Sequence, residues 1–208
     1  MRKIIVSICL AALLATGCVK EPIKHMTTDE SRIYITNHDS TVNFRSFATF
    51  SITDSVAVIT NDRLERKALT DVDAAFINAV KQQMQQLNYQ LVPKNQNPDL
   101  GINVSRIVNV STGVFSYVDY SDYYYGYWDP YYWGYPGYGY YFPTVYGTYQ
   151  VEEGAMSIDM LDLKDAAATQ QIKAIWSGLI RGSGIFNAAT APGQVKALFD
   201  QSPYLNAN

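Results

Sequence analysis

Hydrophobic and polar residues alternate with a helical period in one long stretch of the chain. Between residues 71 and 88, apolar side chains recur every three or four positions and share one face: Val72, Phe76, Val80, Met84 and Leu87. Thr70 precedes this stretch, and Asp73 follows three residues later, a spacing close to that of a capping box. The pattern predicts an amphipathic helix over residues 71–88. A shorter helix is predicted over residues 191–201, with Thr190 as its cap.

Several other stretches alternate between apolar and polar residues, which is the pattern of a half-buried strand. They lie at about residues 32–36, 51–53, 89–92, 100–110, 155–163 and 172–181. Trp176 is in phase with the apolar positions of the last stretch, so we expect it in the core. Arg106 falls on an apolar face, which suggests a bulge or a strand edge. This order of elements predicts an α+β fold, with two main helices packed on one face of a mostly antiparallel sheet.

The first 18 residues have the layout of a secretory signal. Two basic residues precede an apolar run over residues 4–15, and small residues then lead to Cys18. The run holds 12 residues, whereas a membrane-spanning helix needs about 20. The ending Ala15-Thr16-Gly17-Cys18 resembles the lipobox of bacterial lipoproteins, in which the cysteine is acylated. The resemblance implies a signal peptide over residues 1–17 and a lipidated tether over residues 18–31.

The residue after the cysteine bears on the expected destination. In lipoproteins of this kind, an Asp at that position is associated with retention at the inner membrane, and here the residue is Val19. An acidic run, which marks surface export in some bacteria, does not follow. The resemblance therefore implies an outer-membrane lipoprotein that carries palmitate or a similar acyl chain and faces the periplasm.

Composition removes several classes of function. The chain has two cysteines, one within the signal and one at the lipidation position, so no thiol is left for a disulfide or a metal. Without the signal, 14 basic and 19 acidic side chains remain, a net charge of −5. A chain of this charge lacks the basic footprint of a nucleic-acid-binding protein. Residues 32–204 are long enough for a single domain with its own core.

Residues that carry chemistry are scattered rather than clustered. The two histidines, His25 and His38, lie in the tether and near a loop, so we expect no metal and no cofactor. The nucleophile motif G-x-S-x-G does not occur. Asp159 and Asp162 form the best acid pair, but residues three apart on a strand point to opposite faces. We expect them to face solvent or cap a turn, and we expect no catalytic residues.

A segment rich in tyrosine interrupts the pattern over residues 111–148. Residues 117–149 contain 14 of the 17 tyrosines and no Lys or Arg, and their glycines and prolines disfavour a helix. This low-complexity insertion is longer than an ordinary loop. Its candidate contact residues are Tyr124, Tyr127, Trp128, Tyr132 and Trp133.

Four interpretations of the insertion stay open. It is a tolerated loop without a partner, a surface for a protein, a platform on which sugar rings stack, or a contact with the bilayer interface, where Trp and Tyr are favoured. Single-stranded nucleic acid also stacks on aromatic rings, but it needs a positive groove that the segment does not supply.

Four short motifs resemble those of a family of bacterial envelope lipoproteins catalogued as a domain of unknown function. They are residues 43–50, the turn at residues 98–100, residues 154–162 and the run Ile175-Trp176-Ser177-Gly178. The resemblance covers about residues 32–204 and carries no catalytic residues with it. It implies the fold and the location and leaves the activity open. Because the sequence shows no catalytic cluster, we expect a non-enzymatic binding or scaffold module of the cell envelope, whose partner is an envelope protein or a glycan. The alternative is an envelope glycan-binding or glycan-processing hydrolase with an aromatic platform.

Overall fold

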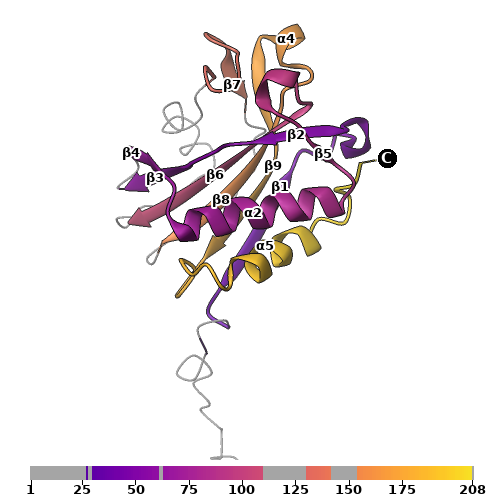
Figure 1. Ribbon diagram of the computed structural model, residues 1–208. Coiled ribbons are helices and arrows are strands. Elements are labelled where there is room, and N and C mark those ends of the chain that lie inside the picture. Colours follow the sequence, from indigo (N-terminus) through magenta and orange to yellow (C-terminus); the bar gives the residue numbers. More distant parts are fainter. Residues whose placement is uncertain (1–26, 28–29, 61–62, 110–129, 142–153, 208) are drawn as a thin grey trace, which may run out of the picture.

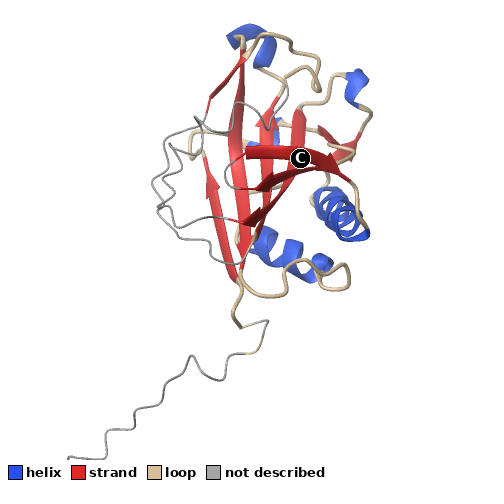
Figure 2. Cartoon of the chain, turned by 90° about the vertical axis from the view of Figure 1, so that its left-hand side faces the viewer, coloured by secondary structure: helices blue, strands red, loops and turns tan. Residues whose placement is uncertain are grey.

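The computed structural model describes residues 27, 30–60, 63–109, 130–141 and 154–207. Nine strands within this part of the chain form one sheet, and the two main helices lie over the same side of it (Figures 1 and 2). The predicted α+β class, with helices on one face, is confirmed. No helix in the described ranges combines the length and the apolar character needed to cross a bilayer.

The bounds of the elements follow the sequence patterns closely. The strands are β1 (Ile33–His38), β2 (Thr49–Ile52), β3 (Val56–Thr60), β4 (Arg63–Ala68), β5 (Gln90–Leu91), β6 (Leu100–Asn109), β7 (Gly139–Tyr141), β8 (Ala155–Asp162) and β9 (Gln171–Arg181). The helices are α2 (Asp71–Gln86), α4 (Ala166–Thr169) and α5 (Ala191–Asp200), with short 3-10 turns η2 (Phe44–Ser46) and η3 (Lys94–Gln96).

The long strands pair antiparallel in the order β1-β9-β8-β6. Beyond them, β6 shares its outer edge between β2 and β3, and both of these short strands run parallel to it. The hairpin of β3 and β4 was not predicted. Its first strand, Val56–Thr60, is apolar at four consecutive positions and buried on both faces, so it does not alternate. Its second strand carries four charged residues, as suits an exposed edge.

Helix α2 begins with the predicted capping box. The backbone N–H of Asp73 donates to Thr70 Oγ1 at 3.3 Å, and the backbone N–H of Thr70 donates to Asp73 Oδ2 at 2.9 Å. The same carboxylate lies 3.5 Å from Arg106 Nε. Pairing with β8 is unbroken from Leu100 to Ile107, whereas pairing with β3 shifts register between Ile107 and Asn109, next to Arg106. A guanidinium is tolerated on the apolar face because Asp73 supplies its counter-charge.

Helix α5 begins differently from the prediction. Thr190 stands at its N-cap, but its side chain bonds no backbone N–H of the first turn. The Thr190 hydroxyl instead accepts a hydrogen bond from Gln194 Nε2 at 2.8 Å. Thr190 therefore bonds a side chain of the helix rather than the backbone of its first turn.

The two faces of the sheet carry separate hydrophobic clusters. The larger lies between the sheet and the helices, and Trp176 is 1% exposed within it, as predicted. Its indole Nε1 donates to Ser202 Oγ at 2.9 Å. The smaller cluster lies on the opposite face, because its residues in β8, Ala155 and Leu161, alternate with those of the first. The candidate site lies on this second face of the sheet.

Candidate functional site

Residues 130–141, called the aromatic segment here, are the part of the tyrosine-rich insertion that the structure describes. Three backbone hydrogen bonds fold it into turns: Gly134 N–H to Tyr131 O at 3.2 Å, Tyr135 N–H to Pro130 O at 2.9 Å, and Tyr138 N–H to Tyr135 O at 3.3 Å. Its end forms β7, which pairs parallel with β9. The Tyr135 hydroxyl also donates to Leu163 O at 3.0 Å. Main-chain and side-chain bonds together hold the segment against the second face of the sheet.

Trp133 anchors the aromatic segment in the smaller hydrophobic cluster. It is 5% exposed, and its indole lies directly over Gly101 of β6. A Cβ atom at Gly101 would lie 3.1 Å from the Trp133 ring and 2.9 Å from Leu163 Cδ1, so only glycine leaves room for this approach. The contact explains why a glycine stands inside a long buried strand.

Tyr132 lies beside this anchor and is held by polar contacts. Its hydroxyl accepts a hydrogen bond from the backbone N–H of Asp54 at 3.2 Å, and its ring meets Trp133 edge-on at 4.9 Å. Lys94 Nζ lies 3.9 Å from the Tyr132 ring centroid, and Lys67 Nζ lies 5.5 Å from it. Burial raises the pKa of the Tyr132 hydroxyl. The ammonium groups of Lys67 and Lys94 therefore lie near the Tyr132 ring, and the hydrogen bond to Asp54 fixes the position of that ring.

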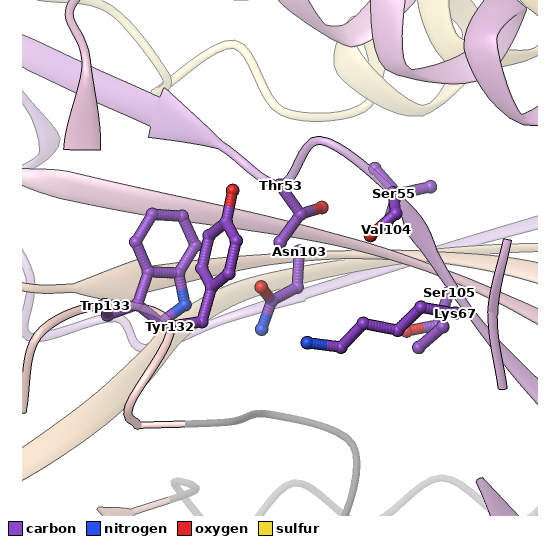
Figure 3. A pocket seen from close by; sticks show the side chains of 9 residues that line it. Thr53, Ser55, Lys67, Asn103, Val104, Ser105, Tyr132 and Trp133 are labelled. Atoms are coloured by element: carbon purple, nitrogen blue, oxygen red, sulfur yellow. The ribbon is translucent and has the colours of Figure 1, made fainter. Parts of the chain in front are cut away.

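A polar recess opens beneath Tyr132 (Figure 3). It has a volume of about 20 Å³ and is lined mainly by Thr53, Ser55, Lys67, Asn103, Ser105, Tyr132 and Trp133. Asn103 is 5% exposed and Ser105 is 1% exposed. Thr53 Oγ1, Asn103 Nδ2 and Ser105 Oγ are buried atoms with no hydrogen-bond partner within the described residues. Buried polar groups are usually paired, so three such atoms in one recess mark a site rather than a packing detail.

A row of polar side chains continues from the recess across the next two strands. Asn103 of β6 is in register with Asp159 of β8, which is in register with Ser177 of β9. The Ser157 hydroxyl donates to Asp159 Oδ2 at 3.1 Å. Burial raises the pKa of Asp159 to about 7, and the bond from Ser157 opposes this only in part.

The expectation that Asp159 faces solvent is wrong, because it is 2% exposed. Alternation placed it correctly on the face away from the helices, but that face is covered by a second cluster. Asp162 does cap a turn, as predicted: it accepts a hydrogen bond from Asp165 N–H at 3.1 Å. It lines a different cavity, of about 380 Å³, together with Phe47 and Lys173. The two carboxylates therefore do not converge.

Asp159 is expected to make the domain less stable as the pH rises from about 4 to about 7. The folded protein keeps the Asp159 proton up to about pH 7, whereas the unfolded chain releases it near its ordinary value of 3.8. Between these values the folded state binds more protons, so the stabilisation present at low pH is lost as the pH rises. Burial also raises the pKa of Asp162, which adds a slope of the same sign.

Urea unfolding at about pH 5 and about pH 8 measures this effect. We expect Asp159→Asn to flatten the pH dependence and the matched change Asp200→Asn, at an exposed carboxylate, to leave it unchanged. Equal slopes for the parent chain and Asp159→Asn would contradict the assignment.

The predicted contact residues fall into two groups. Tyr132 and Trp133 belong to the site, but Trp133 is buried and so acts as an anchor rather than an exposed contact. Tyr124, Tyr127, Trp128 and the predicted lipidation residue Cys18 lie outside the described residues. Their binding and attachment roles stay predictions.

Sequence reasoning missed five polar residues that line the recess: Thr53, Ser55, Lys67, Asn103 and Ser105. Asn103 and Ser105 occupy the polar positions of the alternating strand β6, and such positions usually face water. Their alternation was the available signal, but it does not reveal that a distant segment folds over that face. The described residues contain no cluster of three or more His, Cys, Asp or Glu side chains that would hold a metal ion.

The chain is similar to several known proteins. A family model described as a domain of unknown function (DUF4136) matches residues 35–204. A crystal structure of a DUF4136 family protein from Bacteroides thetaiotaomicron is 29% identical to this chain, with a TM-score of 0.69, over 85% of this chain and 98% of that one. No curated protein matches the sequence.

Two further structures are more distant. A PDZ domain protein from Parabacteroides distasonis is 12% identical with a TM-score of 0.43, over 86% of this chain and 41% of that one. A dodecamer of PelC from Paraburkholderia phytofirmans is 8% identical with a TM-score of 0.39, over 85% of this chain and 98% of that one. Both likenesses are too weak to bear on this chain.

Proposed function

This chain belongs to the DUF4136 family, whose function is unknown, and on that premise we propose that it is a non-enzymatic binding module of the cell envelope. The observation that carries the proposal is the aromatic segment, which is fixed against the sheet above a recess with three unpartnered polar atoms. Buried polar groups usually have a hydrogen-bond partner, so three without one in the same recess favour a bound polar group there.

The location of the module is part of the proposal. Acylation at Cys18 would anchor it in the outer membrane, with the domain on the periplasmic side. The tether over residues 18–31 would leave the domain close to the bilayer, where envelope proteins and glycans are within reach. The aromatic segment then offers rings of low conformational entropy as a contact surface.

A glycan-processing hydrolase is the second candidate, and one observation favours it. Asp159, with its raised pKa, lies in register with Ser177 on the face that the aromatic segment covers in part. Glycoside hydrolysis generally needs two carboxyl groups that flank the bond to be cleaved. Asp162 lies in a different cavity, and His38 stacks on Tyr204 at 3.9 Å. These placements support binding over catalysis.

Site-specific crosslinking in cells tests the proposed function. A photoreactive phenylalanine analogue at Tyr131, which is 74% exposed beside Tyr132, is expected to capture a specific envelope component. The matched control is the same probe at Leu69, which is 60% exposed at the start of α2. We expect the triple change Tyr124→Ala, Tyr127→Ala and Trp128→Ala to reduce capture about tenfold, as the loss of interface hot spots does.

The outcomes separate the two candidates. Capture at position 131 that persists in Asp159→Asn supports a binding module. The same species at both probe positions, or none at either, would refute the aromatic segment as the contact surface. Glycan cleavage by the purified protein that Asp159→Asn abolishes would establish the hydrolase instead.

A further inference from the structure

The three unpartnered atoms of the recess share one property: each can donate a hydrogen bond. Asn103 Nδ2 is a donor, and the hydroxyls of Thr53 and Ser105 rotate to donate or accept. A buried polar atom left without a partner destabilises the folded protein, because it has lost its bond to water. All three residues line the same small recess (Figure 3). Within the described residues, no acceptor meets these three atoms, so the recess is prepared for one.

The dimensions of the recess restrict what enters. A cavity of about 20 Å³ admits a group the size of a water molecule or of one carboxylate oxygen. A sugar ring or an aromatic ring does not fit. The body of a larger ligand would therefore lie outside, against Tyr132 and Ser55, and only a small oxygen-bearing group would enter.

Charge at the mouth favours an anion. Lys67 lines the recess, and Lys94 lies against the same Tyr132 ring. One carboxylate is close: Asp54 bonds the Tyr132 hydroxyl through its backbone, while its side chain accepts from Ser55 Oγ at 3.1 Å. Asp159 is one strand further on, beyond Asn103. Among the described residues, Lys67 therefore lines the recess, Lys94 lies against the Tyr132 ring, and the nearby Asp54 carboxylate already accepts a hydrogen bond.

We propose that the recess beneath Tyr132 binds the carboxylate group of a small organic acid. One carboxylate oxygen accepts from Asn103 Nδ2 and from the hydroxyls of Thr53 and Ser105. The second oxygen stays at the mouth, in the field of Lys67 and Lys94. The inference deepens the proposed function, on which it rests, by naming the chemical class of the ligand.

Titration of the full acylated protein in detergent micelles with acetate tests this assignment. The readout is the side-chain amide signal of Asn103 in a ¹⁵N-labelled sample, identified by its loss in Asn103→Val. We expect a saturable shift with a Kd of about 1–10 mM, as befits a ligand of four heavy atoms. Acetamide has nearly the same shape without the charge, and we expect it to shift the signal at least tenfold more weakly at equal concentration and matched ionic strength.

Two variants complete the design. Ser105→Ala removes one donor and is expected to weaken acetate binding about tenfold, the effect of one hydrogen bond to a charged group. Ser51→Ala, at a buried serine outside the recess, is the matched control and is expected to leave binding unchanged. Thermal unfolding of both variants checks that each is folded.

Equal responses to acetate and acetamide, or no saturable response up to about 100 mM, would overturn the proposal and leave the recess as a water site. The result is independent of the crosslinking experiment. Capture at Tyr131 without acetate binding would keep the binding module and reject the carboxylate, whereas failure of both would reject the module itself.

Discussion

Replacement of residues 1–18 by a secretory signal with an Ala-x-Ala cleavage site and no cysteine is expected to move the whole protein from the membrane fraction to the soluble periplasm. Each buried acyl CH₂ group contributes about 0.8 kcal/mol to membrane binding, and two or more chains anchor a protein stably. If Cys18 carries these chains, their removal releases the domain completely. Cell fractionation measures the effect, and intact mass shows whether the parent protein carries the acyl groups.

A change of one residue provides the matched control. Val19→Asp keeps Cys18 and is expected to leave the protein acylated but to move it from the outer to the inner membrane, as the resemblance to lipoproteins implies. A protein that stays in the membrane fraction after the replacement, or whose parent form has only the bare polypeptide mass, would contradict lipidation at Cys18.

Asp73→Ala is expected to destabilise the domain by about 3–5 kcal/mol, because it leaves a largely buried cation without a counter-charge. Asp73 is 0% exposed, and the Arg106 side chain that it faces is 15% exposed. The substitution also removes the acceptor for Thr70 N–H in the capping box of α2. Urea unfolding, followed by the loss of helix signal, measures the change.

The double change Asp73→Ala with Arg106→Met separates the charge effect from the loss of the cap. We expect it to recover most of the stability, since the unpaired charge is gone, and to leave a loss of about 1 kcal/mol for the cap. Thr70→Ala alone should match that residual loss. A double variant no more stable than Asp73→Ala would show that the ion pair is not the cause.

Local sequence was sufficient where the interacting residues are close along the chain. The capping box of α2 joins residues three apart, and the apolar period of the helix specifies which face it buries. The alternation over residues 155–163 and 172–181 predicted both strands, which the structure pairs as β8 and β9. The family was also predicted from short motifs, and the match over residues 35–204 confirms it.

Contacts between distant residues were not accessible in the same way. The burial of Val56–Thr60 on both faces erased the alternation that would have revealed β3. Arg106 appeared to need a bulge, because only the fold brings Asp73 of α2 to it. Residues 111–148 carry no periodic pattern, and nothing local indicates that Trp133 fills the space left by Gly101.

The sequence by itself determined the class of the fold and the helix-bearing face of the sheet, because each depends on periodicity, and lipid attachment at Cys18 stays a prediction from neighbouring residues. Only the tertiary structure decided that the other face is covered. That covering places Asn103 and Ser105 in a recess beneath Tyr132. Asp159 is also buried on this face, and its desolvation raises the pKa of its carboxyl. The physical reason is that desolvation depends on what packs over a residue, and the segment that packs there lies some 30 residues away in the chain.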